Sequence, residues 1–240
     1  MRIGVIGCGT IASALVPRLA RDGHEIVVSE RSHTRSTALA AAHENVIVAD
    51  NQGVIDRADL IFVALMAEAA ESILTDLEFR SGQSVISLMA GASLADLSLW
   101  VSPAAAPAIL LPFPNVATPG APVIAMGKMT ALRGLLEPHN LIYTVENQAE
   151  LDATLAAQAV LSPVVAMVQE ASMWLGDRVA DPAAGEAFLR ALVGSNLMEG
   201  PCAPLLDALN TPGGYNQRLR QHMQGAGMVD YLTEGLNKLG

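Results

Sequence analysis

The sequence predicts an α/β domain over residues 1–148, followed by an all-α domain over residues 149–240. Up to Tyr143, short β-branched runs alternate with Ala-rich helical segments, which is typical of a parallel sheet with helices on both faces. The first strand candidates are almost continuously apolar, as strands covered on both faces are. After residue 151 no strand pattern remains, and turn signals separate helical segments.

Each element is predicted from its pattern of apolar residues and the turn residues beside it. Strands of the first domain are expected at 3–6, 25–29, 46–48, 60–64, 84–87, 108–111 and 123–125. Helices between them are expected at 11–22, 34–43, 67–77 and 94–101. Helices of the second domain are expected at 153–175, 185–197, 203–209, 215–223 and 228–239. The joint between the domains is expected at 145–150.

Composition and charge exclude several classes of protein. Apolar residues make up 51% of the chain and charged residues 16%, enough apolar surface to exclude intrinsic disorder. The net charge is −10, with 14 Lys and Arg in no basic run, which argues against nucleic acid or an anionic membrane as a partner. The uncharged segment 153–168 is shorter than the ~20 residues of a membrane span. We therefore expect a buried or inter-subunit helix there.

Cysteine and histidine positions indicate neither a disulfide framework nor a metal site. Cys8 and Cys202 form no spaced set, and no Cys/His cluster has zinc spacing. The N-terminal apolar run is broken by glycines and lacks the features of a signal peptide. A cytoplasmic protein with reduced thiols and no bound metal is the expectation. The histidines are scattered, and we assign none to catalysis.

The helical domain is too apolar for its size. It holds about 90 residues rich in Ala, Leu, Val and Met, and a domain that small buries only about 60% of its surface. We expect its helices to pack against a second copy of the chain, which predicts a homodimer.

A glycine motif carries the most functional information in the first domain. The segment GCGTIA at 7–12 fits G-x-G-x-x-G/A, follows the first predicted strand and opens the first predicted helix. Gly7 permits the tight turn, Gly9 lets a pyrophosphate approach the backbone, and Ala12 lets helix and strand pack closely. This context predicts a Rossmann dinucleotide-binding domain; an ordinary strand-to-helix turn is the alternative. The cofactor-binding residues expected here are Gly7, Gly9, Thr10, Ile11 and Ala12.

The end of the second predicted strand bears on cofactor choice. Glu30 lies about 20 residues beyond the glycines, where an acidic residue holds the ribose 2′-hydroxyl of NAD. Arg31, Ser32 and Arg35 offer cations and a hydroxyl suited to the 2′-phosphate of NADP. The sequence favours NADP slightly and leaves NAD open. The alternative is that Glu30 and Arg31 are a solvated charge pair.

Over nearly its full length the chain resembles the pyrroline-5-carboxylate reductase family. The most specific similarities are the NTPGG turn and the final helix pair, because a glycine motif alone fits many dehydrogenases. The similar segments are IGVIGCGTIASA at 3–14, 58–64, VISLMAGA at 85–92, LPFPN at 111–115, 150–153, NTPGG at 210–214, and 225–235.

The resemblance implies an enzyme of proline biosynthesis type. It implies a Rossmann domain, a helical domain that interleaves with its partner, and hydride transfer from NAD(P)H to the C=N carbon of a small cyclic imine carboxylate. Asn115 would lie beside the nicotinamide. Thr211, Gly213 and Gly214 would hold the substrate carboxylate, although a plain helix-capping turn is the alternative for this segment. Asn216 takes the place of a threonine that contacts the imine nitrogen. Its side-chain oxygen would accept from an iminium N–H, or the residue would serve only as a polar residue at the helix N-terminus.

Departures from the family pattern gather around the substrate. The family's Lys-Pro after the fourth strand appears as Met66-Ala67, its Pro-Asn-Thr-Pro as PNVA at 114–117, and its Ser-Gly-Ser-Gly-Pro-Ala-Tyr as QAVLSPV at 158–164. The substrate is therefore left open, with pyrroline-5-carboxylate accepted weakly or replaced by a related ring.

Two other functions are alternatives for this sequence. A non-catalytic NAD(P)-binding homodimer, acting as a sensor or scaffold, stays open because of the altered segment 158–164. The β-hydroxyacid dehydrogenases share the domain plan but use a lysine in the helical domain, and this chain has none between Lys128 and Lys238.

Overall fold

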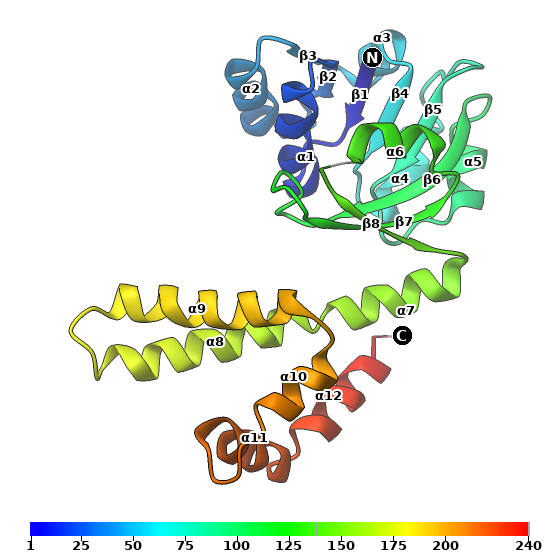
Figure 1. The fold of residues 1–240 in the computed structure, drawn as a ribbon. Helices are drawn as coiled ribbons and strands as arrows, with labels where there is room; N and C mark the ends of the chain where they lie inside the picture. The colour runs from blue at the N-terminus through cyan, green and yellow to red at the C-terminus, as the bar shows by residue number, and fades with distance from the viewer. Residues whose placement is uncertain (138, 240) are drawn as a thin grey trace. The chain divides into compact units, whose positions relative to one another are not determined.

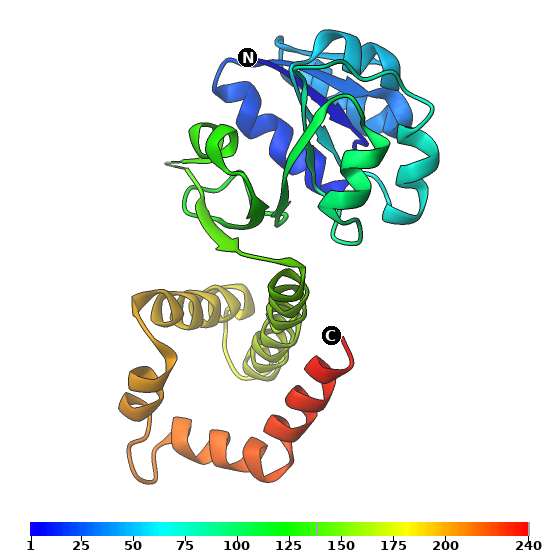
Figure 2. The same cartoon turned by 90° about the vertical axis from the view of Figure 1, so that its right-hand side faces the viewer.

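The computed structural model describes residues 1–137 and 139–239 (Figure 1). It contains two compact units, Met1–Leu151 and Asp152–Gly240. The first is an eight-stranded sheet with helices on both faces, and the second is entirely helical in the part described (Figures 1 and 2). The predicted fold class is confirmed. The sequence places the domain boundary after residue 148, at the first residue of the helix α7 (Gln148–Gln158).

The first unit consists of strands and short helices in alternation. Its strands are β1 (Arg2–Ile6), β2 (Glu25–Ser29), β3 (Val46–Ala49), β4 (Leu60–Val63), β5 (Ser84–Ser87), β6 (Ala105–Pro112), β7 (Pro122–Gly127) and β8 (Leu141–Val145). Its helices are α1 (Thr10–Arg21), the 3-10 turn η1 (Glu30–Ser32), α2 (His33–Ala42), α3 (Asn51–Arg57), α4 (Ala67–Leu74), α5 (Leu94–Trp100) and α6 (Thr130–Leu136).

The sequence pattern predicts a parallel sheet, but the sheet contains one antiparallel pair. Its strand order is β3-β2-β1-β4-β5-β6-β7-β8, and β6 pairs antiparallel with β7 while every other neighbouring pair is parallel. The cause is the connection 113–121, which has no helix. A parallel pair needs a crossover of a dozen or more residues, so this short loop can only reverse the chain. As a result β7 and β8 run opposite to the first six strands.

β8, α3 and α6 are not among the predicted elements. β8 has the apolar sequence LIYTV but is an edge strand, with Leu141 and Tyr143 exposed. α3 has seven residues and contains Gly53, whose N–H donates to Asp50 Oδ1 at 2.7 Å. α6 is equally short and contains Gly134.

The core lies on both faces of the sheet. One apolar cluster joins α1, α2 and α6 to side chains such as Val5, Phe62 and Leu110. The other joins α3, α4 and α5 to Ile6, Ile61 and neighbouring side chains on the opposite face. The sheet is therefore a rigid platform, and the loops at its edges are held by a packed interior.

The second unit contains helices with almost no interior. After α7 come α8 (Leu161–Gly176), α9 (Pro182–Glu199), α10 (Cys202–Ala208), α11 (Tyr215–Gly225) and α12 (Met228–Asn237). α8 and α9 pack side by side (Figures 1 and 2). The single helix predicted at 153–175 is instead two, divided by a turn at 159–160. Pro163 follows this turn in the first turn of α8, where its missing N–H costs nothing.

Candidate functional site

The loops at the carboxyl edge of the parallel strands form the candidate site. β1 and β4 are neighbours, and the chain leaves β1 toward β2 on one side and returns to β4 on the other. Open α/β sheets bind ligands at such a switch point, beyond the carboxyl ends of the strands. The loops that follow β1, β4, β5 and β6 begin here, and they contain the glycine motif, Met66, Gly91 and Asn115.

Gly7 fixes the turn out of β1. Its φ is +92°, a conformation that side chains with a Cβ rarely adopt, and a Cβ there would lie 2.4 Å from the carbonyl oxygen of Ala64. Its N–H donates to the buried Ser29 Oγ at 2.8 Å. Gly7 thus joins the ends of β1, β2 and β4, and no other residue fits this position.

At Gly9, neither the backbone conformation nor a neighbouring atom requires a glycine, so the reason for a glycine there lies outside the packing of the chain. Its φ of −75° and ψ of −171° suit any residue, and a Cβ there would meet no atom within 4 Å. α1 begins at the next residue, with no side chain capping it and no acidic residue in its first turn. Open space beside a glycine and uncapped amides at a helix N-terminus fit a pyrophosphate group.

The remaining motif residues are positioned by the same turn. Thr10 is exposed, Ile11 is half-buried and Ala12 is buried against the core. Cys8 is fully buried, and burial raises the pKa of its thiol to about 11. A thiol with that pKa is protonated near neutral pH, so Cys8 is a packing residue and no nucleophile.

The predicted 2′-phosphate residues lie on one turn after β2. Glu30, Arg31 and Ser32 form η1, and Arg35 is in the first turn of α2. The side chains of Glu30, Arg31 and Arg35 are exposed, and none makes a hydrogen bond or ion pair with any residue in the described part of the chain. Two arginines without acidic partners are available to an anion, and Glu30 does not neutralise Arg31.

Asn115 is presented by the loop between β6 and β7. The residue is exposed, and its carbonyl oxygen accepts from the N–H of Thr118 at 2.8 Å. Val116, which stands where the family has a hydroxyl, is fully buried. Asn140, directly before β8, is buried and donates from Nδ2 to the carbonyl oxygens of Val116 and Ala121. Sequence reasoning missed Asn140, because a lone Asn before an unpredicted strand carries no signal.

The NTPGG segment forms a turn before α11 in the second unit. Gly213 has a φ of +73°, and its N–H donates to Gln217 Oε1 at 2.8 Å. The N–H of Gly214 donates to the carbonyl oxygen of Thr211 at 2.9 Å. Asn216 is the second residue of α11. The two glycine amides expected to hold a carboxylate thus have acceptors within the chain.

Side chains missed by sequence reasoning brace this turn. Arg220 donates to Asn210 Oδ1 at 2.7 Å and to the carbonyl oxygen of Leu206, in α10, at 3.1 Å. Gln217 Nε2 donates to the same Asn210 oxygen at 3.2 Å. These contacts join the end of α10 to the start of α11.

Comparison with known proteins agrees with this architecture. Residues 2–91 match the family model of NADP oxidoreductase, coenzyme F420-dependent. No curated protein sequence matches the chain. Among solved structures, 1-pyrroline-5-carboxylate reductase from Streptococcus pyogenes superimposes with a TM-score of 0.85 at 22% identity, over 100% of this chain and 96% of that one. The chain has the pyrroline-5-carboxylate reductase fold.

Other structures extend the similarity. The pyrroline carboxylate reductase of Plasmodium falciparum, with NADP bound, gives a TM-score of 0.83 at 13% identity, over 100% of this chain and 95% of that one. A reductive aminase from Aspergillus terreus in complex with NADPH gives 0.61 at 17% identity, over 82% and 74%. The resemblance expected from the sequence is confirmed for the fold.

Within the pyrroline-5-carboxylate reductase fold, the Met66-Ala67 departure lies at the carboxyl edge. Met66 precedes α4 and is 72% exposed. A Cβ on Gly91 would lie 3.1 Å from the Cβ of Ala67, so the turn after β5 and the start of α4 are in close approach. Among the described residues, no three His, Cys, Asp or Glu side chains gather as metal ligands.

Proposed function

We propose that the chain is an NADPH-dependent reductase of a small cyclic imine carboxylate. The open space beside Gly9, at an uncapped helix N-terminus, carries the proposal. A dinucleotide needs close approach to the backbone at this point, and nothing in the packing of the chain itself requires glycine there. The reductases and the imine-related enzymes with the same fold support the C=N chemistry.

The residues present fit the cofactor. The amides of Thr10, Ile11 and Ala12 face the pyrophosphate in this proposal, and Gly9 leaves room for it. Arg31, Ser32 and Arg35 hold the 2′-phosphate, which favours NADPH over NADH. Glu30 is the residue that would permit NADH, through the ribose hydroxyls.

The chemistry asks the protein mainly for positioning. When bound, NADPH would supply the hydride that reduces the imine carbon. A protonated imine is already electrophilic, so no strong base is needed, and holding the reactants in near-attack geometry supplies the rate. Asn115 orients the nicotinamide. The Thr211 hydroxyl holds the carboxylate in this proposal, with Asn216 accepting from the iminium N–H through its side-chain oxygen.

We also propose that the active form is a homodimer joined through the helical unit. Ser172 is the only residue of Asp152–239 in the described structure that is buried. Helices with exposed apolar side chains and no interior need a covering partner.

A direct assay tests the function. Purified protein is mixed with NADPH or NADH and a panel of five- and six-membered cyclic imine carboxylates, and cofactor oxidation is followed. We expect turnover with NADPH, faster than with NADH, and none with matched imines that lack the carboxylate. If neither NADPH nor NADH raises the unfolding temperature of the protein at millimolar concentration, the proposal is wrong.

One observation favours a second candidate. The amides of Gly213 and Gly214 are bonded within the chain, and segment 158–164 departs from the family. A dimer that binds NADPH yet reduces no imine of the panel is a cofactor-binding sensor or scaffold.

A further inference from the structure

Asn140 makes an unusual pair of contacts at the carboxyl edge of the sheet. The residue is 5% exposed and stands directly before β8. Its Nδ2 donates to the carbonyl oxygen of Val116 at 2.9 Å and to that of Ala121 at 3.2 Å. β8 runs opposite to β6 and begins at the edge where β6 ends. The reversal of β7 and β8 therefore brings Asn140 under the loop 113–121.

Other contacts also restrain the loop: Val116 is fully buried in the core, and its N–H donates to the carbonyl oxygen of Phe113 at 2.9 Å. Backbone bonds join Thr118 N to Asn115 O at 2.8 Å and Ala121 N to Thr118 O at 3.0 Å. Gly120 N donates to the carbonyl oxygen of His139 at 2.6 Å. In the described part of the chain, the side-chain hydrogen bonds to this loop all come from Asn140.

The chemistry of the contact fixes the orientation of the amide. Carbonyl oxygens only accept, so the NH₂ group of Asn140 must face Val116 and Ala121. Its Oδ1 has no partner among the described residues. A buried amide with one unsatisfied atom is costly. An apolar side chain would avoid that cost but could not hold the two carbonyls.

We propose that Asn140 is a positioning residue for hydride transfer, holding the loop so that Asn115 meets the nicotinamide in one geometry. The inference rests on the proposed function. One bond falls at the residue after Asn115 and the other at the end of the loop, so both sides of the turn 117–120 are attached to the residue that precedes β8. Loss of the clamp affects the nicotinamide end and leaves the Gly7–Ala12 turn, on another loop, intact.

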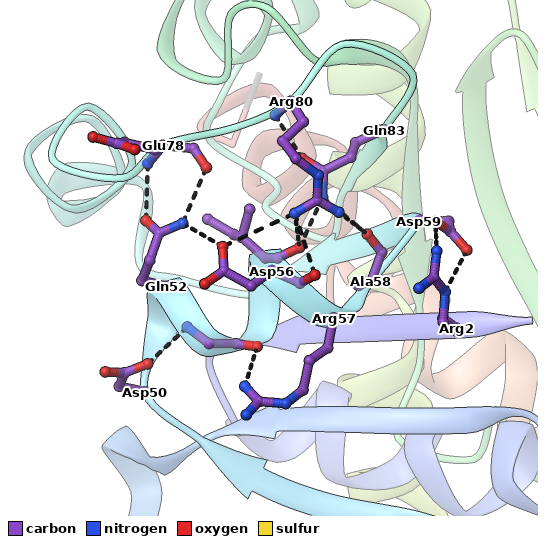
Figure 3. A network of polar contacts seen from close by, with 12 residues as sticks. Arg2, Asp50, Gln52, Asp56, Arg57, Ala58, Asp59, Glu78, Arg80 and Gln83 are labelled. Atoms are coloured by element: carbon purple, nitrogen blue, oxygen red, sulfur yellow. Dashed lines mark hydrogen bonds and ion pairs between the residues drawn. The ribbon is translucent and has the colours of Figure 1, made fainter.

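The chain contains a matched control at the opposite edge of the sheet. Gln83 is 3% exposed and donates from Nε2 to the carbonyl oxygens of Ile55 at 2.8 Å and Ala58 at 2.9 Å. Figure 3 shows Gln83 beside Arg80 and Ala58, in a network at the amino ends of β4 and β5. Gln83 is thus a buried two-carbonyl clamp far from Asn115 in the strand direction. Its loss reports the effect of stability alone.

The experiment compares Asn140→Ala with Gln83→Ala in the full chain. We expect Asn140→Ala to lower kcat about 10-fold or more and to speed hydrogen exchange of the amides of Thr118, Gly120 and Ala121. Its affinity for 2′-phospho-ADP-ribose, which lacks the nicotinamide, should stay within about 2-fold of wild type. Gln83→Ala should change none of the three once the folded fraction is equal.

An isosteric variant covers the case in which Asn140→Ala fails to fold. In Asn140→Asp a protonated carboxyl donates one hydrogen bond, whereas the carboxylate repels both carbonyls. Its kcat should fall as pH rises, with a profile absent from wild type. Unchanged kcat in both variants, or an equal loss in Gln83→Ala, overturns the inference. A wild-type protein that binds no NADPH is the separate failure of the proposed function.

Discussion

The two units of the molecule differ in whether they bury a core of their own. Among the residues that the structure describes, every buried apolar side chain lies in Met1–Leu151, where the helices cover both faces of the sheet. In the described part of the second unit, Ser172 alone is buried, at 9% exposure. The first unit therefore has the packed interior of a stable domain, and the second unit, as a single chain, has almost no interior. The fraction of apolar residues is similar in the two units. The units differ in how far their apolar side chains are exposed.

Exposed apolar side chains of the second unit line two grooves between its helices. α8 and α9 enclose a groove of about 790 Å³ lined by Val164, Val168 and Val193 among others. α8, α11 and α12 enclose another of about 820 Å³, lined by Met167, Leu232 and similar side chains. The helical stretch Gln148–Gly176 is also long and apolar enough to cross a membrane by length and composition alone. In the proposed homodimer, a second subunit would cover both grooves.

The largest effect is expected from a charge placed in the second unit. Val165, on α8, is 57% exposed in the single chain. If a partner covers it, Val165→Asp buries an unpaired charge at a cost of several kcal/mol, comparable to total stability. We expect unfolded or insoluble protein. The matched control is Leu99→Asp, on α5, where the side chain is 76% exposed and a change within about 0.5 kcal/mol is expected.

Light scattering measures the assembly directly. Wild type should be a dimer at micromolar concentration without detergent. A stable wild-type monomer, or equal tolerance of both aspartates, would show that the exposed helices need no partner. A protein soluble only in detergent would favour the membrane explanation.

The next effect separates two glycines in the self-contained unit. Gly9→Val should leave the stability of the free protein within about 0.5 kcal/mol, because nothing lies within 4 Å of its Cβ position. It should abolish stabilisation by NADPH, worth about 2.7 kcal/mol at 100 times the dissociation constant. Gly7→Ala should instead destabilise the free protein by about 1–3 kcal/mol, because φ is +92°. Thermal unfolding with and without NADPH measures both, and retained stabilisation in Gly9→Val contradicts the site.

The sequence predicts the first unit better than the second, for a physical reason. Covered parallel strands and a glycine turn between a strand and a helix depend on short-range patterns, so the turn at Gly7 and Gly9 and the start of α1 could be located in advance. β8 and the reversal at β7 depend on pairing across the sheet. The clamps made by Asn140 and Gln217 depend on contacts that close only in the folded chain. In the helical unit the pattern predicts helices, and Pro163 is the local residue that marks the division of α7 from α8.

A third effect tests whether substrate contacts belong to the second unit. Thr211→Val removes one hydrogen bond to a charged carboxylate, worth about 1.5–3 kcal/mol or roughly 10- to 150-fold in kcat/KM. The dissociation constant of NADPH should not change. Asn216→Ala should lower turnover, and Asn216→Thr should raise activity on pyrroline-5-carboxylate.

Thr233→Val is the control for this series. The Thr233 hydroxyl donates within α12 to the carbonyl oxygen of Val229 at 3.0 Å, away from the turn. Steady-state kinetics should show it unchanged. If Thr211→Val and Asn216→Ala also leave an observed activity unchanged, the substrate contacts lie elsewhere.

A smaller effect concerns cofactor choice in the first unit. Arg31→Ala removes a cation from the proposed 2′-phosphate site and should weaken NADPH several-fold more than NADH. Arg21→Ala, at the exposed end of α1, changes net charge equally and should affect both cofactors alike. Titration by fluorescence measures the four affinities. Equal weakening of both cofactors by Arg31→Ala would remove the preference for NADP.

The smallest effect compares the two thiols. Cys8 is buried in the first unit and its pKa is raised to about 11, whereas Cys202 is exposed in the second. Because the folded protein holds the Cys8 proton more tightly than the unfolded chain does, this group's contribution to stability is complete below pH 9 and is lost as pH rises toward 11. In a Cys202→Ser background, denaturation midpoints should fall over that interval, and Cys8→Ala should remove this part of the pH dependence.

Alkylation at pH 8 should spare Cys8 until the chain unfolds. Rapid modification of folded Cys8 would show that the core beside the glycine turn opens. Protection of Cys202 from alkylation in the wild-type protein would mean that a partner covers α10, because Cys202 is exposed in the single chain.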